Sequence, residues 1–167
     1  MRMKTAGWAL AVVTTMIVPA GMVHAGQAAA PPCPATIAAE FAGWSKPASI
    51  ASASALAIGQ VGRLALTPST DAKFEVTPTK PPATGTFSGV VRFDVAKAGT
   101  YRVALGGPLW IDVVQGGKAL TSVAHAHGPA CSPVKKMVDF ALPAGRYALQ
   151  LSGAKTPDAL VSITTIR

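Results

Sequence analysis

Apolar and polar residues alternate in short runs along most of the chain after residue 59, and Gly and Pro separate the runs. This pattern is typical of β-strands. It predicts strands at residues 61–66, 74–76, 87–95, 101–105, 109–114, 119–127, 134–142, 147–151 and 159–166. Gly116-Gly117 predicts a two-residue hairpin turn, because both centres of that turn need positive φ. So many short strands, with almost no helical period, indicate an all-β protein: an antiparallel β-sandwich or jelly roll with a short N-terminal helix.

The chain divides into three stretches. Residues 1–25 are typical of a secretory signal peptide, because a basic start with Arg2 and Lys4 precedes an uncharged apolar run too short to cross a bilayer. Residues 26–58 form an Ala/Pro/Ser-rich leader, and residues 59–167 form the predicted β-sandwich domain.

The leader contains the one helical pattern. Ile37, Phe41 and Trp44 have helical spacing and predict a short helix at residues 36–44. The Ala/Ser-rich residues 46–56 are expected to be a connector, and the Pro-rich residues 77–84 a loop between strands.

One pattern occurs twice. A strand with Phe93 runs into Ala-Gly and restarts at Tyr101, and a strand with Phe140 runs into Ala-Gly and restarts at Tyr147. We expect each phenylalanine to point inward and each tyrosine to pack its ring while its hydroxyl reaches a backbone group or water. The paired hairpins, over residues 87–166, resemble the pre-peptidase C-terminal type of exported β-sandwich module, which implies a fold and no catalytic residues.

The chain of 167 residues has only two cysteines, Cys33 and Cys131. Export to an oxidising compartment predicts a disulfide between them. Closing so long a loop stabilises a fold by about 4 to 5 kcal/mol in the chain-entropy model. The alternative is a free thiolate at Cys131, acting as a ligand or a nucleophile.

The formal charge of +8 includes Arg2 and Lys4, which the predicted cleavage removes. The other basic residues are scattered, and only Lys135 and Lys136 are adjacent, as an expected solvated strand start. A nucleic-acid surface needs clustered cations with stacking aromatics, so a nucleic-acid partner is not expected. Weak attraction to anionic lipid headgroups or acidic glycans is consistent with this charge, in a periplasmic or secreted protein.

His125 and His127 form the most unusual motif. Residues two apart on a strand share a face, so both imidazoles are expected to point the same way at a strand end. Two such imidazoles can chelate copper, zinc or iron. The alternative is a polar, hydrogen-bonded strand end without a metal.

A metal site needs at least one more ligand. The candidates are Asp139, Asp112, Met137 for copper(I), and Cys131 if it is reduced. The sequence does not place any of them near the histidines.

Gly117, the His125-Ala126-His127 run and the later Pro143-Ala144-Gly145 turn resemble fragments of the two cupin motifs. The resemblance implies an iron-dependent dioxygenase with two histidines and a carboxylate. No glutamate follows Glu75, so Asp139 or Asp112 would have to supply that carboxylate.

Three stretches, at residues 110–114, 125–131 and 136–140, carry a second resemblance over the whole mature chain. They are similar to those of a family of short exported bacterial proteins, some of which are named homogentisate 1,2-dioxygenase. This resemblance implies the same dioxygenase alternative.

Trp110 follows a Gly-Gly-Pro turn, and Asp112 lies two residues later on the same predicted strand. The two are candidates for ligand binding, with Trp110 as a platform for a sugar ring; the alternative places Trp110 in the core. No Gly-x-Ser-x-Gly motif occurs, and no catalytic residue is assigned.

The sequence therefore predicts a binding or scaffold module rather than an enzyme, with a transition-metal ion or a cell-envelope component as partner. Oxygen uptake would indicate the dioxygenase alternative. Binding that depends on Trp110 would indicate a module that recognises glycan or protein.

Overall fold

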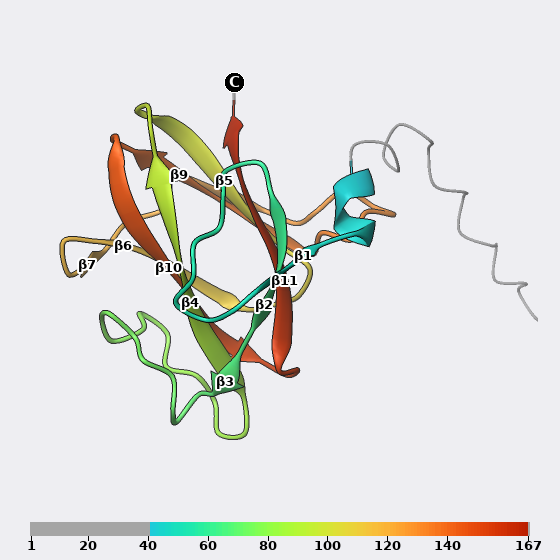
Figure 1. Cartoon of the computed structure of the whole chain (residues 1–167), viewed down its shortest axis with the longest axis vertical. Coiled ribbons are helices and arrows are strands. Elements are labelled where there is room, and N and C mark those ends of the chain that lie inside the picture. The colour runs from blue at the N-terminus through green and yellow to red at the C-terminus, as the bar shows by residue number, and fades with distance from the viewer. Residues whose placement is uncertain (1–40, 167) are drawn as a thin grey trace, which may run out of the picture. The chain divides into compact units, whose positions relative to one another are not determined.

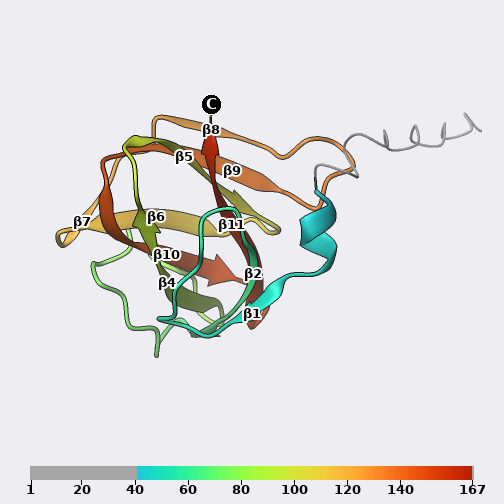
Figure 2. The ribbon, with the colours of Figure 1, turned by 45° about the horizontal axis from the view of Figure 1, so that its top comes forward.

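The computed structural model describes residues 41–166, while residues 1–40 and Arg167 lie outside the described part. The described residues form two β-sheets packed face to face (Figures 1 and 2). Six-stranded sheet A has the order β1 (Ala48–Ile50), β2 (Val61–Ala65), β11 (Asp158–Ile166), β5 (Gly99–Leu105), β9 (Lys136–Leu142) and β8 (Ala124–Ala126). Five-stranded sheet B has the order β3 (Thr67–Pro68), β4 (Phe87–Val95), β10 (Gly145–Ala154), β6 (Trp110–Gln115) and β7 (Lys118–Ala119). The predicted all-β sandwich is confirmed.

All strand pairs are antiparallel except β1 with β2. Alternate residues of the long strands face the other sheet and form one core cluster. Its members include Val91, Phe93, Val103, Val113, Phe140, Leu149, Leu151 and Ile163. The residues between them face outward, and Trp110 and Asp112 of β6 are among these outward-facing residues.

The repeated hairpin pattern is confirmed in its details. The Tyr101 hydroxyl donates to the carbonyl oxygen of Lys97, and the Tyr147 hydroxyl donates to that of Pro143, each over 2.7 Å. The Tyr147 ring also stacks on Phe93, with 5.3 Å between the centroids. Both tyrosines thus bury an aromatic ring and still satisfy the hydroxyl.

The predicted N-terminal helix is not supported. Within the described part, only a 3-10 helix, η1 (Ala42–Ser45), lies at its C-terminal end, and residues 36–40 fall outside. No side chain caps η1, and Pro47 disfavours helical backbone at Lys46. No helix among residues 41–166 is long and apolar enough to span a bilayer.

Two predicted strands and a connector differ from the structure. Residues 74–76 form no strand and instead pack against the outer face of sheet B, while the connector at 46–56 contains β1. The predicted strand at 119–127 is divided, because the chain leaves sheet B after β7 and joins sheet A as its edge strand β8. This crossing opens the edge of β6.

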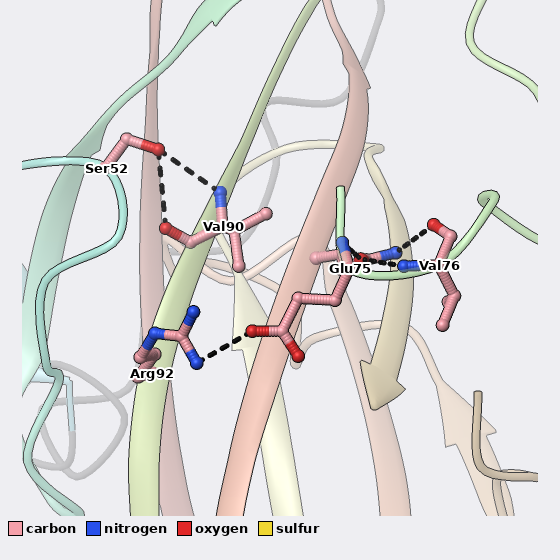
Figure 3. A network of polar contacts seen from close by, with 6 residues as sticks. Ser52, Glu75, Val76, Val90 and Arg92 are labelled. Carbon is pink, nitrogen blue, oxygen red and sulfur yellow. Dashed lines mark hydrogen bonds and ion pairs between the residues drawn. The ribbon is translucent and has the colours of Figure 1, made fainter. Parts of the chain in front are cut away.

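The loop between β3 and β4 contains the predicted Pro-rich segment and lies on the outer face of sheet B. The buried Gln150 side chain accepts hydrogen bonds from the amides of Glu75 (2.6 Å) and Val76 (3.1 Å), and it donates to the carbonyl oxygen of Val76 (3.1 Å). Figure 3 shows Glu75 and Val76 of this loop and the ion pair of Arg92 with Glu75, which spans 2.7 Å. These bonds fix the loop segment that leads into Thr79 and Lys80.

Candidate functional site

The two histidines of the predicted metal site lie at the free edge of sheet A. His125 is on β8 and His127 follows it, and both side chains are exposed. His125 pairs with Val138, a core residue, so the His125 side chain lies on the side of sheet A that faces sheet B.

The expected completing donors lie on the opposite side of sheet A. Met137 and Asp139 alternate with Val138 along β9 and therefore face outward. Arg102 holds the Asp139 carboxylate with two hydrogen bonds, from Nε to Oδ1 over 2.8 Å and from Nη2 to Oδ2 over 2.9 Å. The hydrogen bond and charge of Asp139 raise the pKa of Arg102. Neither Met137 nor Asp139 completes a site with His125.

Among residues 41–166, no group of three or more His, Cys, Asp or Glu side chains could hold a metal ion. Asp112 does share a hollow with His125, although its oxygens already accept hydrogen bonds from other groups. The metal site remains a prediction that rests on two imidazoles.

The loop after β8 contains Cys131, whose φ of 68° places it in the left-handed region. No cysteine in the described part is free, and the predicted partner Cys33 lies outside it, so the pairing of the two stays a prediction.

The structure brings together a different group of side chains around Trp110. Ile111 and Val113 of β6 point into the core, so Trp110 and Asp112 face outward. Trp110 is 36% exposed, so the interpretation of Trp110 as a core residue is wrong. The indole Nε1 donates to Thr79 Oγ1 over 2.8 Å and to Asp112 Oδ1 over 3.1 Å.

The carboxylate of Asp112 is 5% exposed and acts as the anchor of this group. Its Oδ2 accepts from the Thr79 amide over 3.1 Å, and its Oδ1 accepts from the Thr79 hydroxyl. A buried carboxylate needs such donors, and here they fix both the loop and the indole ring.

Two lysines lie against the ring of Trp110. The Nζ atoms of Lys136 and Lys80 are 4.9 and 5.5 Å from the ring centroid, within the range of cation–π attraction. The Lys136 ammonium also donates to the carbonyl oxygen of Leu109 over 3.0 Å. Burial and the neighbouring charge of Lys80 lower the pKa of Lys136, while Asp112 opposes this shift. Lys136 is therefore not the solvated strand start that the sequence predicted.

Trp110 and Lys136 form the wall between two hollows. The edge hollow, of about 440 Å³, lies at the open edge of β6 and has a floor of Ile111, Val138 and Phe140, with His125 and the hydroxyls of Thr121 and Ser122 at its rim. It exists because β7 pairs only with Val114 and Gln115 and leaves residues 110–112 without a strand on that side.

The second hollow, the loop hollow, has a volume of about 320 Å³ and lies between sheet B and the Pro-rich loop. Lys80, Pro82, Leu109 and Ser152 line it together with the two shared residues. The Ser152 Oγ is the one buried side-chain polar atom of the described part that has no hydrogen-bond partner. Native proteins seldom leave such an atom unpaired.

No family model matches the chain, and no curated protein and no solved structure matches it. The sequence singled out Trp110 and Asp112 but missed Thr79, Lys80, Lys136 and Ser152 as their neighbours.

Proposed function

We propose that the protein is an exported ligand-binding module that holds an acidic saccharide of the cell envelope at Trp110. The observation that carries this proposal is the half-exposed indole ring, fixed by Asp112 and Thr79 and flanked by the ammonium groups of Lys80 and Lys136.

The fixed ring supports a saccharide as the ligand. The C–H face of a pyranose ring is apolar and flat, and it stacks on an exposed aromatic ring. Because two hydrogen bonds already hold the Trp110 indole, little side-chain freedom is lost when a ligand binds.

The lysines support a negative charge on that saccharide. Lys80 and Lys136 repel each other, and the carboxylate of Asp112 is already bonded to Thr79 and Trp110. A uronate or sulfate group close to both ammonium groups relieves this repulsion, and charge-assisted hydrogen bonds are the stronger kind.

The location completes the proposal. The predicted signal peptide at residues 1–25 and the predicted disulfide of Cys33 with Cys131 both fit a periplasmic or secreted protein.

Calorimetric titration with oligogalacturonate tests the proposal. We expect Trp110→Ala and Lys80→Met/Lys136→Met each to weaken binding by about tenfold or more. Trp110→Phe is expected to keep part of the affinity because it keeps the ring. Lys97→Met, an exposed lysine elsewhere, is the matched control. Unchanged affinity in Trp110→Ala, with an unchanged circular dichroism spectrum, would refute the proposal.

Fluorescence supplies the evidence of contact. Of the three tryptophans, Trp8 lies in the predicted signal peptide, so in a Trp44→Phe background of the mature chain the emission reports Trp110 alone. We expect oligogalacturonate to shift or quench this emission and a neutral malto-oligosaccharide of equal length to do so weakly. Equal responses to both would remove the lysines from the proposal.

A transition-metal ion at His125 and His127 is a second candidate function. The observation in its favour is that both imidazoles are exposed and two residues apart, with His125 on the edge strand of sheet A and His127 directly after it. A site of two imidazoles holds copper(II) or zinc(II) with at least one water.

A further inference from the structure

The two hollows adjoin each other at Trp110. Both include Trp110 and Lys136 in their walls, with about 440 Å³ on one side and about 320 Å³ on the other. Each volume by itself is at the lower end of the range for small-molecule sites. A single sugar ring on Trp110 therefore leaves most of this space empty.

On the basis of the proposed function, we propose that the site takes an extended acidic oligosaccharide of at least three units. The middle unit stacks on Trp110, one neighbouring unit lies in the edge hollow, and the other lies in the loop hollow.

The edge hollow suits a sugar unit because it is apolar below and polar at its rim. Its floor is formed by core residues such as Val138 and Phe140, which can pack against C–H groups. His125, Thr121 and Ser122 at the rim can exchange hydrogen bonds with hydroxyl groups. The open edge of β6 leaves this hollow accessible from outside the sandwich.

The loop hollow suits an acidic unit. Lys80 and Lys136 both line it. No Asp or Glu of the described residues does so, because the carboxylate of Asp112 belongs to the lining of the edge hollow. Ser152 lines the loop hollow as well, with its 2% exposed side chain and an Oγ that has no partner. A carboxylate or hydroxyl oxygen in the hollow is an acceptor for the Ser152 hydroxyl, which the protein itself leaves unpaired.

The positions of Lys136 and Lys80 set the direction in which the oligosaccharide lies across the two hollows. The Lys136 ammonium lies at the junction, held by the Leu109 carbonyl oxygen, and Lys80 adds its charge on the loop side only. The charged groups of the ligand are therefore expected at the junction and in the loop hollow, and its hydroxyl groups in the edge hollow.

The test is a length series. We titrate the purified protein with galacturonate oligomers of one, two, three and four units and measure the dissociation constant by calorimetry. The expected affinity rises by about tenfold or more from one unit to three and then levels off.

Two variants with matched controls assign the hollows. His125→Ala is expected to weaken trimer binding by about threefold or more and to leave monomer binding unchanged, whereas His127→Ala, which lines neither hollow, changes neither. Ser152→Ala is expected to behave as His125→Ala does, with Ser162→Ala, a buried serine of sheet A, as its control.

The outcomes separate this inference from the proposed function. Equal affinity for monomer and trimer, with Trp110→Ala still weakening binding by about tenfold or more, overturns the extended ligand and leaves the saccharide site. Equal losses for monomer and trimer in His125→Ala and Ser152→Ala overturn the assignment of the hollows. No binding of any galacturonate refutes the proposed function itself, and an equal rise with length for oligoglutamate shows that the site reads charge and not sugar.

Discussion

Gln150→Met removes the side chain that ties the Pro-rich loop to sheet B while keeping its length. Gln150 is 1% exposed, and its amide group makes three hydrogen bonds to the backbone of Glu75 and Val76. Methionine fills the space but offers no partner, so two amide N–H groups and one carbonyl oxygen lose their bonds.

The magnitude follows from those groups. A buried polar group left without a partner costs about 1 to 3 kcal/mol. The summed cost of three such groups is an upper limit, because the loop can leave sheet B and form hydrogen bonds to water instead. Its release then exposes Phe74 and Val76, which pack against the outer face of sheet B. We therefore expect the free energy of unfolding to fall by about 2 to 4 kcal/mol.

The loop also carries Thr79 and Lys80, so the same change is expected to act on the site. Without a fixed loop, the Trp110 indole loses its bond to Thr79 and one of its two ammonium neighbours. We expect saccharide affinity to fall at least as far as in Lys80→Met, that is by threefold or more.

Urea unfolding followed by circular dichroism measures the stability, calorimetry measures the affinity, and hydrogen exchange at the Val76 amide reports the loop directly. Gln60→Met, at a glutamine with a single 3.4 Å bond, is the matched control. A stability loss in Gln150→Met no larger than that of Gln60→Met, with unchanged exchange at Val76, would show that the Gln150 side chain does not hold the loop.

Three further predictions follow from the same site and its surroundings. Burial and the charge of Lys80 lower the pKa of Lys136, so the affinity for an acidic saccharide should be full at neutral pH and should fall, as the pH is raised, earlier than it would with an ordinary lysine. Between the lowered pKa of Lys136 and its pKa in the unfolded chain, the free energy of unfolding should rise with pH, because the unfolded chain binds more protons there. Lys136→Met should flatten both pH curves, and curves parallel to those of the wild type would contradict this. Gly128→Ala should destabilise the protein by about 3 kcal/mol or more in urea unfolding, because the added Cβ would overlap with the Val134 carbonyl oxygen; wild-type stability would show that the loop adjusts freely. Copper(II) or zinc(II) should raise the melting temperature slightly and His125→Ala/His127→Ala should abolish the shift, whereas oxygen uptake with homogentisate and iron(II) would instead support the dioxygenase alternative.

Local signals predicted the fold well where one short segment decides the structure. The Gly116-Gly117 turn has φ values of 58° and 73°, as a two-residue hairpin requires. The strand at residues 87–95 has the predicted bounds, because apolar alternation and flanking turns identify it without help from the rest of the chain. The prediction of one strand at 119–127 was wrong, because the alternation of apolar and polar residues continues across the point where the chain passes from sheet B to sheet A.

The site could be predicted only in part, because it depends on register. The sequence singled out Trp110 and Asp112, two residues apart on one strand, and the structure places both on the outward face of sheet B, where Asp112 accepts a hydrogen bond from the Thr79 amide. The sequence could not show that His125 pairs with Val138, which places Met137 and Asp139 on the far side of the sheet. A shift of one residue in that pairing would have reversed the result.

The sites of the two candidate functions share a cause in the topology. The crossing of the chain from β7 to β8 leaves β6 open at residues 110–112, and the same crossing places His125 beside that opening. An oligosaccharide in the edge hollow and a metal ion on His125 would therefore compete for one imidazole. If both bind, saturating zinc(II) should weaken trimer binding in the wild type but have no effect on monomer binding. The His125→Ala variant, already weakened, should not respond to zinc(II) at all.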